Sequence, residues 1–454
     1  MPENPAPLAV TQRLSEFIAA WAWDDIPQQV RHEAKRSLVN FFAVSLAGCN
    51  DPTIAKAARV LGRFGAGEQA TVIGRAERTD LLNAAALNAM SANVFDFDDT
   101  HIPTIIHPTA PVAAALFALA ESMPLTGRQF LLAFVLGVEI ECRIGKAISP
   151  GHYSRGWHIT STCGVFGAAT AAAKVLQLDA NHLAWALGSA ANQACGLVET
   201  LGTMAKSTSV GNAARNGLLS ALLAQEGFDG PTQPLEGVRG FLNVTGEQPD
   251  LAGLVDGLGS SWELLSNTYK PYPCGVVLNP VIEACLALRA DPGLDLGAIE
   301  TVEITGHPLL RQRTDRPGVR TGRQSQVSAQ HAVGVVLRSG LAGLEQFSDT
   351  AVADEAVRNL GNKVRFIDDE NFSIDAARVV VRMAQRPPVS ASVEFASGSL
   401  QKPLTDRALE EKLETLCAYG GSGCDPAPLI EAVWSFDNNA DASAILHLAA
   451  GKKA

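Results

Sequence analysis

Six polar side chains lie close together between residues 93 and 108, in a stretch that is otherwise apolar and rich in alanine. They are Asp96, Asp98, Asp99, Thr100, His101 and His107. Burying carboxylates and imidazoles is unfavourable unless they pair, bind an ion or take part in chemistry. A structural alternative is that Asp98 or Asp99 caps the next helix, with prolines marking the turns around it. The number of such groups in one short stretch nevertheless indicates a site.

Two further groups of polar residues lie where helices are expected to begin. His158 follows a Gly-Trp pair and precedes a long helix rich in glycine and alanine, so the helix dipole there favours a neutral imidazole and attracts anions. The stretch Lys-Ser-Thr-Ser, from Lys206 to Ser209, precedes a second such helix that starts at Val210. A substrate carboxylate would be well received at both positions. The alternative at Lys206 is ordinary Ser/Thr capping beside a solvated lysine.

The segment 269–275 contains two prolines and lies where the helical pattern ends. We expect Lys270 to point from this rigid segment into a cleft, unless the segment is only a hinge. Cys274 has no histidine partner nearby in the sequence that would make it a nucleophile. Further along, His331 opens an apolar helix, where a histidine on its own is more often a core residue.

The composition limits the possible partners. The 454 residues are 47% apolar and 18% charged, with a net charge of −11 and no block of like charges. This balance indicates a globular protein and disfavours nucleic acid and anionic membranes as partners. The chain shows neither an N-terminal leader nor an apolar run long enough to cross a membrane, so we expect a soluble cytoplasmic protein. Eight cysteines without C-x-x-C spacing are typical of core residues in a reducing compartment.

Helical patterns dominate the chain from about residue 8 to residue 265. Clear examples are the segments 113–120, 130–144, 164–178 and 211–225. These segments are apolar on nearly all sides, which predicts helices buried against one another. Beyond Pro271, the segments 299–304, 378–383 and 389–395 predict strands. Helical spacing returns after Pro403, so we expect an inserted α+β domain, and domain interfaces are favoured ligand sites.

Taken together, five motifs resemble, in order and spacing, those of the MmgE/PrpD superfamily. The motifs are Asp-Phe-Asp-Asp-Thr (96–100) with a following His107-Pro108, Gly-Trp-His-x-Thr (156–160), Lys-x-x-x-x-Gly-Asn-Ala-Ala-x-x-Gly (206–217), Lys-Pro-Tyr-Pro-Cys-Gly (270–275) and Ser-x-Gln-His (328–331). The resemblance spans nearly the whole chain. The family contains 2-methylcitrate dehydratase, cis-aconitate decarboxylase and iminodisuccinate epimerase.

The resemblance implies a mainly α fold. A large all-helical domain would be formed by both chain ends, residues 1–267 and 405–454, with a smaller α/β (α+β) lid domain inserted at residues 268–404. It also implies a homodimer that uses neither a cofactor nor a metal ion.

The resemblance further implies a set of site residues. The positions matched to a decarboxylase-type pocket are Asp96, Thr100, His107, His158, Lys206 and Lys270, and a seventh position, commonly Tyr, is His331 here. We predict these seven as catalytic. Candidate substrate-binding residues are His101, Ser209, Tyr272, Cys274 and Asn279. Ser209 and Asn279 stand where many members have His, which alters the groups that can carry a proton.

All reactions of this family build up negative charge on a carbon next to a carboxylate, so nearby cations must stabilise it. Lys206, Lys270 and the helix N-termini are suited to binding a small di- or tricarboxylate, while His158 and His331 are suited to proton transfer. Asp96 could orient a neighbour or act as a base itself. We therefore expect a cofactor-independent lyase, foremost a dehydratase of the 2-methylcitrate type or a decarboxylase.

Three alternatives remain open at this point. The first is an isomerase or epimerase that removes and returns an α-proton, as the replaced Tyr and His positions suggest. The second is a metal-dependent hydrolase, in which Asp96, Asp98, Asp99, His101 and His107 bind a divalent ion. The third is a helical scaffold without catalytic activity.

Overall fold

The computed structural model describes residues 9–65 and 67–451. These residues divide into two compact units. The larger unit comprises the described residues up to 94, residues 98–267 and residues from 406 onward, and the smaller unit comprises residues 95–97 and 268–405.

The larger unit is helical. Its helices are α1 (Val10–Ala20), α2 (Gln28–Gly48), α3 (Pro52–Leu61), α4 (Leu81–Asn93), α5 (Thr109–Ala120), α6 (Gly127–Ile148), α7 (Gly151–Ser154), α8 (Ile159–Val175), α9 (Ala180–Ala191), α10 (Ala205–Gln225), α11 (Phe241–Thr245), α18 (Asp406–Gly420), α19 (Pro426–Trp434) and α20 (Ile445–Ala449). Short strands β1 (Ala70–Thr71), β2 (Arg78–Thr79) and β3 (Asp99–His101) lie between them.

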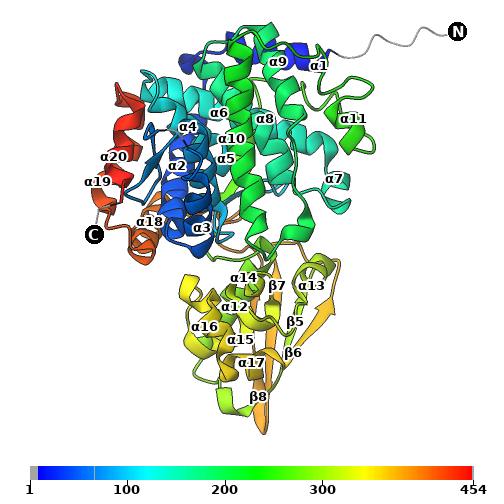
Figure 1. Cartoon of the computed structure of the whole chain (residues 1–454). Helices are drawn as coiled ribbons and strands as arrows, with labels where there is room; N and C mark the ends of the chain where they lie inside the picture. The colour runs from blue at the N-terminus through cyan, green and yellow to red at the C-terminus, as the bar shows by residue number, and fades with distance from the viewer. Residues whose placement is uncertain (1–8, 66, 452–454) are drawn as a thin grey trace, which may run out of the picture. The chain divides into compact units, whose positions relative to one another are not determined.

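The centre of this unit is formed by helices that are apolar on all sides. Every residue of α5 is buried, and α8 packs against α5, α6 and α10 (Figure 1). Small residues allow this close packing: a Cβ on Gly217 of α10 would lie 2.6 Å from the Val165 carbonyl oxygen of α8. The buried helices predicted from the sequence are thus present, although α8 begins at Ile159 and ends at Val175, earlier than the predicted 164–178.

The C-terminal helices share the core of the larger unit. Helix α18 packs against α2, which lies far from it in the sequence (Figure 1). The Phe130 ring lies 4.5 Å from that of Phe117 and 5.1 Å from that of Phe436, between centroids. An aromatic cluster therefore joins the two ends of the chain.

The smaller unit contains a four-stranded sheet in the order β6-β5-β7-β8. The strands are β5 (Ile299–Gly306), β6 (Val364–Asp368), β7 (Ala377–Met383) and β8 (Arg386–Val393); β5 and β6 are parallel and the other pairs antiparallel. The unit also contains helices α12 (Asn279–Arg289), α13 (Pro308–Thr314), α14 (Gly322–Ser325), α15 (Ala329–Ser339), α16 (Asp349–Ala353) and α17 (Glu355–Gly361). A remaining strand, β4, spans Asn267–Tyr269.

Alternation along the strands creates the core of this unit. Val302, Ile304, Val379 and Val381 are fully buried, and α12 packs against β7 and β8. The predicted strand at 389–395 is shifted, because β8 begins at Arg386 and includes two prolines. Proline is tolerated there because β8 is an edge strand that needs fewer backbone donors.

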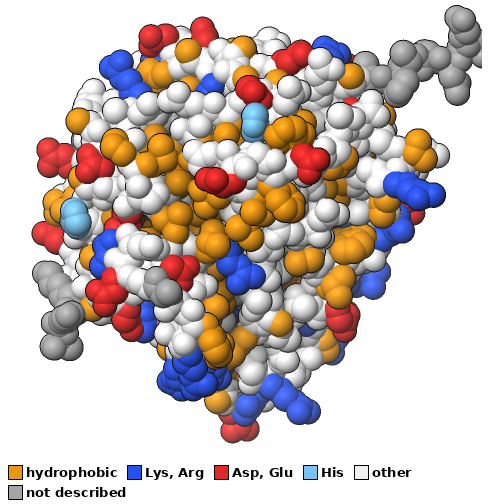
Figure 2. All heavy atoms as spheres, turned by 45° about the horizontal axis from the view of Figure 1, so that its top comes forward, with side chains coloured by type: hydrophobic (Ala, Val, Ile, Leu, Met, Phe, Trp, Pro, Cys, Tyr) orange, Lys and Arg blue, Asp and Glu red, His pale blue; other side chains and the backbone are white. Residues whose placement is uncertain are grey.

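The surface of one face and the lengths of the helices complete the description of the fold. On the face drawn in Figure 2, acidic and basic side chains are interspersed with apolar ones. Among the residues 9–65 and 67–451, none of the helices is both long and apolar enough to cross a bilayer.

Candidate active site

His107 is held by a tight turn between β3 and α5. The His101 backbone N–H donates to the Ile106 carbonyl at 2.8 Å, and Ile105 adopts a left-handed φ of 60°. This conformation is strained for a β-branched residue, and such strain is often found at functional sites. The turn brings the His107 ring back beside β3, where Nδ1 lies 2.6 Å from the Asp99 carbonyl oxygen and 3.4 Å from Thr100 Oγ1.

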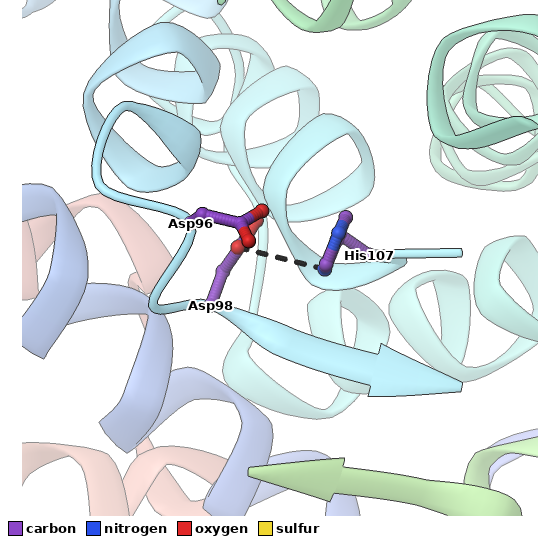
Figure 3. A group of neighbouring side chains, drawn as sticks. All are labelled: Asp96, Asp98 and His107. Atoms are coloured by element: carbon purple, nitrogen blue, oxygen red, sulfur yellow. Dashed lines mark ion pairs between the residues drawn. The ribbon is translucent and has the colours of Figure 1, made fainter. Parts of the chain in front are cut away.

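Asp98 places a carboxylate near this ring in the larger unit. Its Oδ1 lies 3.5 Å from His107 Nδ1 (Figure 3), and its Oδ2 accepts a hydrogen bond from Asn93 at 2.6 Å. The side chain is almost fully buried. Asp98 therefore places negative charge beside the imidazole without forming a close ion pair.

Asp99 stabilises the start of α5. Its Oδ2 accepts from the backbone N–H of Thr109, at 3.3 Å, and from the Thr109 hydroxyl and Asn267 Nδ2. The capping role considered for Asp98 or Asp99 thus falls to Asp99, although it lies ten residues before Thr109. Burial, together with the charge of Asp98, raises the pKa of Asp99 to about 7 against the opposing hydrogen bonds.

His158 stands at the N-terminus of α8, as predicted, and is the N-cap residue. The hydroxyl of Thr160, in the first turn of α8, accepts the backbone N–H of His107 at 3.1 Å. His158 Nδ1 lies 3.1 Å from the hydroxyl of Ser161 in the same turn. Both histidines are therefore tied to the first turn of one helix, where the unpaired backbone N–H groups favour anions.

Lys206 and Ser209 connect a second helix to this group. Helix α10 begins at Ala205 rather than at Val210, so Lys206 lies in its first turn, Ser209 begins its second turn, and neither residue precedes the helix. Ser209 Oγ donates to the Lys206 carbonyl at 2.9 Å and lies 3.5 Å from His158 Nδ1. The larger unit thus brings together Thr100, His107, His158 and Ser209, and Lys206 lies three residues before Ser209 on α10.

His101, predicted to bind substrate, is turned into a different cluster. Its Nε2 donates to Glu263 at 3.1 Å and its Nδ1 lies 2.8 Å from Thr104 Oγ1, in a fully buried position. Burial lowers the pKa of His101 despite the bond to Glu263. Although burial opposes it, hydrogen bonds from His101 and Lys146 hold the pKa of Glu263 at about 2. His101 is therefore a neutral donor to a buried carboxylate.

In the smaller unit, Lys270 pairs with Asp96. Lys270 Nζ lies 3.2 Å from Asp96 Oδ2 and donates to the Asp96 carbonyl oxygen at 2.8 Å. Asp96 adopts a left-handed φ of 53°, which aspartate tolerates better than most residues. Two residues that sequence reasoning selected separately, 174 positions apart, are therefore partners.

His331 lies in the first turn of α15, which Ser328 caps by accepting the His331 backbone N–H. Its Nε2 donates to the Gln346 carbonyl at 2.7 Å, and burial lowers its pKa. Cys274 Sγ lies 3.8 Å from Asn279 Oδ1. Burial raises the pKa of Cys274 and of Tyr272 far above their usual ranges, so both side chains are neutral.

The five-residue metal hypothesis does not hold for His101, because Glu263 and Thr104 engage both of its ring nitrogens. In Asp99, Oδ2 accepts from Thr109 and Asn267, while Oδ1 has no hydrogen-bond partner. Asp98 and His107 keep donor atoms near one another, with Asp96 two residues before Asp98 in the chain (Figure 3).

Sequence reasoning missed the residues that hold these groups in place. Thr160 and Ser161 were visible as a polar run after His158, which is a usable signal. Glu263, Asn267 and Gln346 were not identified, because their partners are distant in the sequence or are backbone atoms.

The chain thus combines a large helical unit with a smaller α+β unit. The larger unit carries histidines and a lysine at helix N-termini, which are groups suited to acid–base chemistry. The chain belongs to the MmgE/PrpD family: the MmgE/PrpD N-terminal domain matches residues 12–253 and the MmgE/PrpD C-terminal domain matches residues 272–437.

Relatives from fungi and mammals cover the same length. The chain is 29% identical over 477 residues to a cis-aconitate decarboxylase of Aspergillus terreus, covering 98% of this chain and 97% of that protein. It is 24% identical over 458 residues to the cis-aconitate decarboxylase of Homo sapiens, covering 98% and 95%. A 24% match to the cis-aconitate decarboxylase of Mus musculus covers 89% of this chain and 86% of that protein.

Proposed function

We propose that this protein is a lyase that decarboxylates a small tricarboxylate of the cis-aconitate type. The full-length similarity to cis-aconitate decarboxylases supports the reaction class. The observation that carries the proposal is the placement of both histidines at the N-terminus of α8: His158 is its N-cap, and the His107 backbone N–H donates to Thr160 of its first turn. Ser209, which lies 3.5 Å from His158 Nδ1, donates to the backbone carbonyl of Lys206. These groups provide two proton carriers and a cation.

The chemistry requires these groups. When the carbon–carbon bond to the leaving carboxylate breaks, carbon dioxide departs and the electron pair remains on the substrate as a carbanion conjugated with a second carboxylate. Lys206 and the helix N-termini stabilise that charge. A protonated imidazole then delivers a proton to carbon, which completes a dicarboxylate with one carbon fewer.

Asp96, Lys270 and His331 are proposed for the same reaction through the family resemblance. Lys270 supplies a second cation whose charge Asp96 partly balances, at 3.2 Å. His331 stands where family members commonly have Tyr. Its Nδ1 bears the lone pair of the neutral ring, because Nε2 donates to the Gln346 carbonyl. We leave His101 out of this set because Glu263 engages it.

Dehydration was the foremost expectation from the sequence, and the same groups would serve it, since loss of water also leaves charge beside a carboxylate. The relatives favour decarboxylation. Removal and return of an α-proton, as in an epimerase, is the remaining alternative with the same equipment.

The test is proton NMR in D₂O of the purified protein with citrate, 2-methylcitrate, cis-aconitate, malate and aspartate-derived diacids. We expect cis-aconitate to lose carbon dioxide and a deuteron to enter the product. Lys206→Ala should abolish turnover, whereas Lys402→Ala, which changes a half-exposed lysine paired with Glu283, should not. Loss of water from 2-methylcitrate would favour the dehydratase, and deuterium entry into an otherwise unchanged diacid the epimerase. Silence across the panel would overturn the proposal.

The homodimer and the cytoplasmic location expected from the sequence stay predictions. Light scattering of the purified protein tests the first, and fractionation of the source cells tests the second.

A further inference from the structure

We propose that His107 and His158 exchange protons only through Nε2, because their surroundings keep a proton on Nδ1, and that Ser161 and Ser209 are positioning residues for His158. The tautomers follow from the geometry alone. Their catalytic consequence rests on the proposed function.

The proton on His107 is assigned by a backbone carbonyl. Nδ1 lies 2.6 Å from the Asp99 carbonyl oxygen, which can only accept. Thr100 Oγ1 and Asp98 Oδ1 lie at 3.4 and 3.5 Å from the same nitrogen. A proton on Nδ1 therefore donates to the Asp99 carbonyl, the nearest of the three oxygens. In the neutral ring Nε2 must then carry the lone pair.

The proton on His158 is assigned by two serine hydroxyls. Ser161 Oγ lies 2.9 Å from the His158 carbonyl oxygen and 3.1 Å from His158 Nδ1. Ser209 Oγ lies 2.9 Å from the Lys206 carbonyl oxygen and 3.5 Å from the same Nδ1. Each hydroxyl has one proton, and for both the carbonyl is the nearer acceptor. Both oxygens therefore present lone pairs to Nδ1, which donates to them.

Gly196 fixes this arrangement from the other side. Its carbonyl accepts the His158 backbone N–H at 3.0 Å. A Cβ on Gly196 would lie 2.0 Å from Ser161 Oγ and 3.2 Å from Ser209 Cβ. Its φ of 139° also disfavours a side chain. Backbone packed this closely leaves the Ser161 hydroxyl little room to rotate away from the His158 carbonyl.

Other histidines of the chain provide internal standards for both tautomers. His331 donates from Nε2 to the Gln346 carbonyl, so its lone pair is on Nδ1. His152 donates from Nδ1 to the Thr245 carbonyl at 3.2 Å, and its Nε2 accepts from Thr162. One spectrum of the protein thus contains a known example of each form.

The experiment is a long-range proton–nitrogen correlation spectrum of protein labelled with ¹⁵N-histidine, in the absence of substrate and at a pH where the rings are neutral. Single His→Gln variants assign the signals. We expect His107 and His158 to show a protonated Nδ1 and an unprotonated Nε2, like His152 and unlike His331. A His158 signal of the His331 type would overturn the proposal.

The positioning role is tested by removing the hydroxyls. The Ser161→Ala/Ser209→Ala variant should mix the two tautomers of His158 while the His107 signal stays unchanged. We expect kcat to fall about 10-fold with little change in KM. This loss is smaller than the rate factor of about 10²- to 10⁴-fold that acid–base catalysis provides, because the imidazole is still present. Ser91→Ala, which removes a buried helical hydroxyl that donates to the Leu87 carbonyl, is the matched control.

The spectroscopic and kinetic results separate two kinds of failure. If the protein has no lyase activity, the proposed function fails, but the tautomers can still be observed in the spectrum. If the double variant keeps a single Nδ1–H tautomer at His158 and full kcat, the positioning role is wrong whatever the reaction.

Discussion

The two units differ in how many ionisable side chains they bury. Among the described residues of the smaller unit, Lys270 and His331 are the buried members of the Asp, Glu, Lys, Arg and His types. Both were predicted as site residues. The larger unit buries many such groups: Arg36, Asp98, Asp99, His101, Glu139, Glu141, Arg143, His152, His158, Lys206, Glu236, Glu263 and Lys412. In the smaller unit the buried charges thus coincide with the predicted site residues, whereas in the larger unit the contacts of each group must be compared.

The contacts in the larger unit suggest a rule. Structural charges, such as Arg143 and Glu263, have charged partners at short range. His107 Nδ1 instead lies nearer to the Asp99 carbonyl oxygen, at 2.6 Å, than to the Asp98 carboxylate, at 3.5 Å, and His158 Nδ1 lies beside the Ser161 hydroxyl. Neutral oxygens of this kind allow an imidazole to change its charge. The first kind should affect stability and the second kind turnover.

The largest expected effect is on turnover at His158. Replacing it with Gln should lower kcat by about 10²- to 10⁴-fold, since a proton carrier is lost, with little change in unfolding. His182→Gln, which changes a partly exposed histidine paired with Asp179, should retain activity. Steady-state kinetics beside urea unfolding provides the measurement. A His158→Gln protein with wild-type kcat would remove His158 from the site.

Arg143→Met should show the opposite pattern. The guanidinium is bonded to Glu139 at 2.6 Å and to the carbonyls of Leu254, Asp256 and Ser261. Removing it leaves a buried carboxylate without its cation, which costs about 3–5 kcal/mol. Urea unfolding should show this loss, while kcat per folded molecule stays unchanged. A fall in kcat without a stability loss would break the proposed rule.

Glu263 and Glu141 should respond to pH with opposite signs. Because the folded pKa of Glu263, about 2, lies below its usual value of 4.5, its stabilisation is present above pH 4.5 and is lost as the pH falls towards 2. Glu263→Gln should therefore cost about 3 kcal/mol at neutral pH and progressively less in acid.

Burial raises the pKa of Glu141 well above 4.5, and the charge of Asp99 adds to this shift. The stability contribution of Glu141 is therefore full below pH 4.5 and is lost as the pH rises. Glu141→Gln should gain stability relative to the parent protein as the pH rises. Urea unfolding of both variants over a pH series tests the pair, and parallel pH profiles would contradict the assignment.

Lys270→Met tests the smaller unit. Asp96 would lose its partner at 3.2 Å and its carbonyl would lose a donor. Because the Asp96 side chain is 19% exposed, water compensates in part and we expect a loss of about 1–3 kcal/mol. Asp96→Asn and the double variant complete a thermodynamic cycle. Additive losses would show that the two groups are not energetically coupled.

The sequence predicted the elements better than the partners. Helical patterns located α5, α6, α8 and α10: nearly all residues of the first three helices are buried, and α10 is buried along one side. It misplaced the start of α10 by five residues, since Lys206 to Ser209 look like a cap although they lie within the helix.

For the site, the resemblance of the motifs selected the histidines and lysines. It did not reveal the backbone carbonyls and distant side chains that form hydrogen bonds with them. The Asp99 carbonyl beside His107 and the Gln346 carbonyl beside His331 are backbone atoms with no residue-type signature. Glu263 lies 162 positions from His101. Such contacts exist only once the chain has folded, so spacing along the sequence does not reveal them.

The smallest effect is expected at an exposed ion pair of the smaller unit. Arg382 Nε lies 2.8 Å from Glu303 Oε1, and the Arg382 side chain is 55% exposed. Hydrogen bonding to Arg382 lowers the pKa of Glu303, but solvent screening makes such pairs worth well under about 1 kcal/mol. Arg382→Gln should therefore leave unfolding and kcat almost unchanged. Lys270→Met and Arg382→Gln each remove one cation from the same unit, so a difference in their losses of stability is due to burial. Equal losses of stability in the two variants would show that burial does not distinguish these charges.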